Sequence, residues 1–128
     1  MAATKITQTG PSGLILYNNT DLDGTKDAVS AAASTLYQVY VDNSANASAA
    51  SYVKLWDTAS GSVTVGTTAP DEIIYVAGGA RVTQTYLTVA AGGKAFATAI
   101  TAACVTTAGT TGTTNPTSNV IVSILYTT

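Results

Sequence analysis

Short runs of apolar and β-branched residues recur along the chain, separated by polar, turn-forming residues. In several runs the side chains alternate between apolar and polar, which is the period of a strand with one buried face. The runs cover residues 13–17, 35–41, 51–57, 62–65, 72–76, 81–89 and 119–126. They predict an all-β protein of about seven or eight strands, arranged as an antiparallel, jelly-roll-like β-sandwich.

Three other features refine this prediction. The runs at 35–41 and 51–57 follow one another across a short polar segment, so we expect them to pair as antiparallel neighbours. Residues 94–106 mix alanine with β-branched residues, which favours a turn or short strand followed by a strand ending near Thr107. Residues 27–34 contain helix-forming alanines after Asp27, but so short a helix is marginal, and we expect a turn or two at most.

The length of 128 residues suits a single domain. Residues 35–128 carry most of the predicted strands and are expected to form the sandwich. Residues 1–34 are interpreted as an N-terminal arm or an added strand of the same domain. The Thr- and Gly-rich residues 108–118 form the longest expected loop, of a kind that often makes contacts.

Charge and composition exclude several classes of function. The chain has no histidine, which excludes a Ser-His-Asp triad and histidine-ligated metals. Its five basic residues are dispersed among seven acidic ones, so no basic stripe is present and no nucleic-acid partner is expected. No apolar run has the length of a membrane span or the form of a secretory signal, which indicates a protein made in the cytoplasm without membrane contact.

One segment has part of a calcium-binding pattern. Asn19, Asp21, Asp23 and Gly24 match the first half of an EF-hand loop, where oxygen ligands alternate before a glycine turn. The twelfth position of such a loop, which requires a glutamate that binds calcium through both carboxylate oxygens, is occupied here by Ser30. These residue types are also common in turns, so a solvated loop is favoured, and a weak cation site is left open.

Catalytic candidates are few. Asp71 and Glu72 are the only adjacent acid pair, but they follow Pro70 at the start of a strand, where acids usually mark a solvated turn. Cys104, the only cysteine, has no cationic neighbour in sequence and is interpreted as a small core residue. The sequence therefore predicts that the protein is not an enzyme and needs no cofactor or metal.

Tyrosine is prominent, with seven residues against one Trp and one Phe. Five aromatic residues lie on strands expected to be neighbours: Tyr37, Tyr40, Tyr52, Trp56 and Tyr75. Aromatic side chains on a sheet can stack on sugar rings. The same side chains can also fill a core and a protein interface. This second interpretation of the candidate interaction surface is the favoured one.

The middle and end of the chain resemble a known group of proteins. Residues 36–43, 52–57 and 63–71, together with the 106–118 loop leading into residues 120–126, resemble the small β-sandwich virion proteins of tailed bacteriophages, especially cyanophages. Proteins of this group act as capsid cement or decoration proteins. The resemblance covers roughly residues 35–128.

This resemblance implies a structural virion protein that binds the outer surface of a phage capsid and stabilises the head. It implies the major capsid protein as partner and a homo-oligomer, with a trimer favoured. The alternative is a carbohydrate- or receptor-binding β-sandwich module of a phage tail, which would use the aromatic residues.

Overall fold

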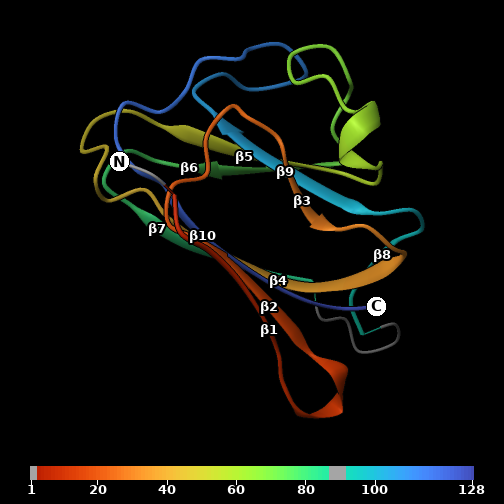
Figure 1. Cartoon of the computed structure of the whole chain (residues 1–128). Helices are drawn as coiled ribbons and strands as arrows, with labels where there is room; N and C mark the ends of the chain where they lie inside the picture. Colours follow the sequence, from red (N-terminus) through yellow and green to blue (C-terminus); the bar gives the residue numbers. More distant parts are fainter. Residues whose placement is uncertain (1–2, 87–91) are drawn as a thin grey trace.

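The protein is an all-β sandwich of two antiparallel sheets packed against each other, as predicted (Figure 1). The structure is a computed structural model, and it describes residues 3–86 and 92–128. One sheet has six strands and the other has four. Within the described residues, the only helical segments are two short 3-10 turns, Pro11–Gly13 and Ser60–Ser62.

The six-stranded sheet has the strand order β1-β2-β10-β4-β7, and β8 also pairs with β4. Its strands are β1 (Lys5–Thr9), β2 (Ile15–Asn19), β4 (Ser34–Asp42), β7 (Arg81–Thr85), β8 (Lys94–Phe96) and β10 (Ile121–Thr127). The four-stranded sheet has the order β3-β9-β5-β6. Its strands are β3 (Asp27–Ser30), β5 (Ser51–Trp56), β6 (Glu72–Val76) and β9 (Ile100–Val105).

The core lies between the two sheets and is made by alternate residues of their strands. Val122 and Ile124 of β10 and Val53 and Leu55 of β5 are all fully buried. On β4, Leu36 and Val39 are both buried although they are three residues apart. A β-bulge explains this spacing. The register with β10 shifts between Leu36 and Gln38, so β4 has one extra residue there, and Leu36 and Val39 both point into the core.

The first 34 residues contribute strands to both sheets. β2 pairs with β10 along its whole length, and Tyr17 and Leu22 are part of the core. β1 and β2 form a hairpin whose turn extends away from the two layers (Figure 1). The N-terminal residues therefore supply an added hairpin and also part of the core.

The helix considered for residues 27–34 is wrong, because residues 27–30 form β3. This strand pairs with β9, and Val29 is buried between the sheets. The chain then turns sharply, and the hydroxyl of Ser34 lies 2.8 Å from that of Ser30 and donates to it. Strand pairing and burial of Val29 outweigh the helix propensity of a few alanines.

The expected pairing of residues 35–41 with 51–57 is also wrong, because β4 and β5 lie in opposite sheets. The connection between them is fixed by the buried side chains of Asn43 and Asn46. Asn43 donates to the carbonyl oxygens of Ala49 at 3.0 Å and Ala77 at 3.1 Å, and its own amide oxygen accepts from Asn46 and Ser51, both at 2.9 Å. These bonds replace the short hairpin that the sequence suggested.

The remaining strand predictions are partly confirmed. Residues 94–106 divide into β8 and β9, as expected for a short strand followed by a longer one. Residues 62–65 form no strand, because Val63 follows the Ser60–Ser62 turn and packs against Trp56. The strand predicted over residues 81–89 corresponds to β7, which ends at Thr85. Residues 87–89 of that prediction lie outside the described part of the chain.

Candidate interaction surface

The two sheets differ in how their outer faces are covered. Over the four-stranded sheet lie the loops that contain residues 57–71 and 106–118, and all six residues of β9 are buried. Lys54 of β5 is buried there and donates to the carbonyl of Thr111 at 2.9 Å. The outer face of the six-stranded sheet is the exposed one, and we call it the open face.

The strand register shows which residues form the open face. Ile6 lies beside Asn18, then Ser123, Tyr40 and Thr83 in one row across five strands. Gln8, Leu16, Leu125, Gln38 and Thr85 form the next row. A third, shorter row at one end joins Ile121, Asp42 and Arg81.

The open face is almost free of charge. The ten residues of the two full rows include no acidic or basic side chain, and the only charges of the three rows are Asp42 and Arg81, whose side chains bond to each other at 3.0 Å. Three aliphatic side chains on it are well exposed: Ile6 at 47%, Leu16 at 37% and Ile121 at 37%. Depletion of charge with exposed aliphatic and tyrosine side chains is typical of the centre of a protein interface.

The five aromatic residues predicted as an interaction surface do not form one stripe. Tyr37 and Tyr40 lie on β4 in the six-stranded sheet, whereas Tyr52, Trp56 and Tyr75 lie in the four-stranded sheet. Tyr40 is half-buried in a row of the open face. Tyr37 is the extra residue of the β4 bulge, and its hydroxyl lies 3.3 Å from the hydroxyl of Thr127.

Trp56 makes no contribution to a surface because it is fully buried. Its indole N–H donates to the carbonyl of Thr68 at 2.9 Å, and its ring packs with Val63 and Ala103. Tyr52 and Trp56 are four residues apart on β5, so the alternation of a strand places both on one face. What the sequence could not reveal is that the 57–71 loop folds back over one end of that face.

Tyr52 and Tyr75 form an aromatic pair at the other end of the same face. They are opposite each other in the β5–β6 register, and their ring centroids lie 5.5 Å apart with the planes tilted by 53°. Tyr75 is 56% exposed, and its neighbour Ile73 is 36% exposed. Tyr75 and Ile73, with the half-buried Tyr52 beside them, form a second, smaller exposed patch.

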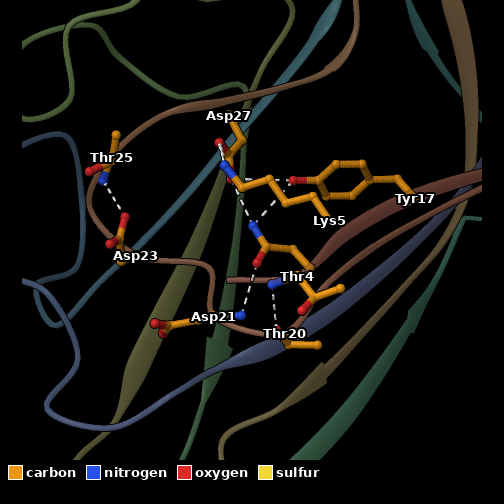
Figure 2. Close-up of polar contacts among 9 residues, drawn as sticks. Thr4, Lys5, Tyr17, Thr20, Asp21, Asp23, Thr25 and Asp27 are labelled. Carbon is orange, nitrogen blue, oxygen red and sulfur yellow. Dashed lines mark hydrogen bonds and ion pairs between the residues drawn. The ribbon is translucent and has the colours of Figure 1, made fainter. Parts of the chain in front are cut away.

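A polar cluster at the base of the β1–β2 hairpin fixes it against the opposite sheet (Figure 2). Asp27 of β3 accepts from the ammonium of Lys5, from the Asn19 amide at 2.7 Å and from the Tyr17 hydroxyl at 3.2 Å. Burial, with a smaller contribution from the nearby Asp27 carboxylate, raises the pKa of Tyr17 to about 12, so its hydroxyl stays a donor. No local pattern in the sequence indicates this cluster, because its members come from three separate strands.

The residues of the calcium-like pattern have local roles. Asn19 accepts from the backbone N–H of Asp21 at 2.9 Å, and Asp23 accepts from the backbone N–H of Thr25 at 2.7 Å (Figure 2). Gly24 donates its backbone N–H to Asn115 of the long loop at 2.9 Å. Across residues 3–86 and 92–128, no three His, Cys, Asp or Glu side chains come together as metal ligands.

The acid pair is divided between two structural roles. Asp71 accepts from the backbone N–H of Asp57 at 2.7 Å, and Glu72 lies 3.7 Å from the ammonium of Lys94.

Cys104 is buried, and this burial raises the pKa of its thiol to about 12, which keeps the sulfur protonated.

All five basic residues are engaged. Lys5, Arg81 and Lys94 pair with carboxylates, while Lys26 and Lys54 donate to the backbone carbonyls of Val63 and Thr111.

In the part of the chain that the structure describes, no helix is long and apolar enough to cross a membrane. Comparisons with protein-family models, with curated proteins and with solved structures found no match.

Proposed function

We propose that the chain is a structural virion protein that binds the outer surface of a phage capsid and stabilises the head, with the major capsid protein as its partner. The observation that carries the proposal is the open face of the six-stranded sheet. Its two full rows offer ten uncharged residues on a rigid sheet, so a protein can cover it at a small cost in desolvation.

The resemblance of residues 35–128 to capsid cement proteins supplies the identity of the partner. A homo-oligomer that engages several capsid subunits at once needs only weak binding at each contact, because the first contact raises the effective concentration for the others. The role proposed is binding without catalysis or a cofactor, and the engagement of Asp71, Glu72 and all five basic residues in internal contacts favours it. The same engagement of the basic residues favours a protein partner over nucleic acid.

The test is attachment of the purified protein to phage heads that lack it. Leu16→Glu places a charge on the open face, and we expect it to reduce attachment by about tenfold or more. Ile73→Glu is the matched control, since Ile73 is equally exposed, at 36% against 37%, but lies on the other sheet. Attachment that Leu16→Glu leaves unchanged contradicts the proposal.

The second candidate is a carbohydrate-binding module, and the Tyr52–Tyr75 pair, in which Tyr75 is exposed and Tyr52 is half-buried, favours it. In that case an immobilised glycan retains the protein, Tyr75→Ala releases it, and Leu16→Glu has no effect. If the glycan retains the protein, these two variants behave in this way, and the protein fails to attach to phage heads, the carbohydrate role replaces the capsid role.

A further inference from the structure

β1 lies at the edge of the six-stranded sheet, and all five of its residues are exposed. In the described residues it pairs with β2 on one side only. An edge strand of this kind presents unpaired backbone groups that can pair with another strand.

The hydrogen bonds of the hairpin identify which backbone groups are free. Gly10 donates to Leu14 at 2.7 Å, and Thr20 donates to Thr4 at 3.1 Å. Antiparallel pairs alternate between hydrogen-bonded and non-bonded, so Ile6 and Gln8 also direct their backbone groups towards β2. The N–H and C=O groups of Lys5, Thr7 and Thr9 therefore point to the free edge.

The free edge has little of the usual protection against pairing. It contains no proline, its register with β2 is unbroken over five residues, and its one charged residue, Lys5, is already paired with Asp27. Among the other edge strands, β3 has four residues with a register shift and β8 has three residues. β6 and β7 have five residues each in an unbroken register, but these two edges lie close to one another across the two sheets, whereas all five residues of β1 are exposed.

The sequence of β1 is also complementary to itself. When two copies run antiparallel about a two-fold axis at Thr7, Thr7 faces its own counterpart, and each Lys5 faces Thr9 of the other copy. Each copy then uses all six free backbone groups, and the two lysines lie at opposite ends of the contact. On the open face Ile6 comes beside Gln8 of the other copy, so the uncharged surface continues from one sheet into the next.

We infer that a second copy of this chain is the partner of β1, so that two six-stranded sheets join into one through a two-fold β1–β1 contact. This specifies the oligomer of the proposed function, and it predicts a dimer where the resemblance implied a trimer, because a two-fold contact closes at two copies. A pair of five-residue strands buries less than the ~1,200 Å² of a standard interface, so the isolated dimer is weak.

The experiment measures molar mass by analytical ultracentrifugation from micromolar to high-micromolar concentration. The wild type is expected to shift from monomer to dimer. Thr7→Asp and Thr7→Lys each place two like charges opposite each other at the axis, and each is expected to weaken the dimer about tenfold or more. A mixture of the two variants restores it, because the mixed dimer places opposite charges there.

Thr9→Asp is the matched control. It carries the same charge change on the same exposed strand, but in this register it faces Lys5 of the other copy, so the dimer persists or strengthens. Thermal unfolding confirms that all variants fold. A wild type that stays monomeric or forms a trimer, or a Thr9→Asp variant as weak as Thr7→Asp, overturns the β1 contact. Monomers that still attach to heads leave the proposed function standing, whereas dimers that do not attach overturn that function alone.

Discussion

At the scale of single residues, short polar side chains close the loops of this sandwich by capping backbone N–H groups. Asp57 is the clearest case, since its carboxylate accepts from the backbone N–H of Thr98 at 2.7 Å, Ala97 at 2.8 Å and Ala99 at 3.3 Å. Partial burial pushes the pKa of Asp57 upward, but the three donors together outweigh it and hold the pKa below its usual value.

This depressed pKa predicts a loss of stability in acid. A carboxylate with a lower pKa in the folded state than in the unfolded state stabilises the fold above the unfolded pKa of ~3.9. That contribution disappears as pH falls through the folded pKa. Asp57→Asn is expected to lower stability at neutral pH and to flatten its decline below about pH 4. Urea unfolding from pH 7 to pH 2 measures this, and an unchanged acid profile contradicts it.

At the scale of elements, the crossing from β4 to β5 is the connection that determines the topology. Asn43 is fully buried, and its side chain bonds to Ala49 and Ser51 in the segment that leads into β5 and to Ala77 after β6, so it fixes the chain as it leaves one sheet for the other. Asn46 extends this network by bonding Ser118 in both directions, at 3.0 and 2.8 Å.

Asn43→Ala is therefore expected to destabilise the fold by about 2–4 kcal/mol, because the hydroxyl of Ser51, the Asn46 amide and two backbone carbonyls each lose one hydrogen bond at a buried site. Asn18→Ala is the control, since Asn18 is half-buried on the open face and its amide oxygen accepts a single bond, from Ser123 at 2.7 Å. Denaturant unfolding compares the two. Equal losses contradict a special role for the crossing.

At the scale of the whole molecule, stability depends on the layer between the sheets, and the open face contributes little to it. β10 contains a direct comparison, because Ile124 is fully buried in the core and Ile121 of the same strand is 37% exposed at the end of the open face. Ile124→Ala is expected to cost about 2–5 kcal/mol through lost burial and a cavity. Ile121→Ala is expected to cost less than about 1 kcal/mol. Thermal unfolding of both variants measures the difference, and similar losses contradict the assigned sides of β10.

The fold class and most of the strands could be predicted from the sequence, because alternation and turn residues are local signals. Cys104 is also buried, as predicted from the absence of a cationic neighbour in sequence. Prediction from the sequence failed where the answer depended on segments distant in the chain. The opposite sheets of β4 and β5, the burial of Trp56 under the 57–71 loop and the polar cluster around Asp27 all depend on such contacts. The open face could not be predicted either, because a sheet face is defined by strand order and register, which only the packing of the two layers decides.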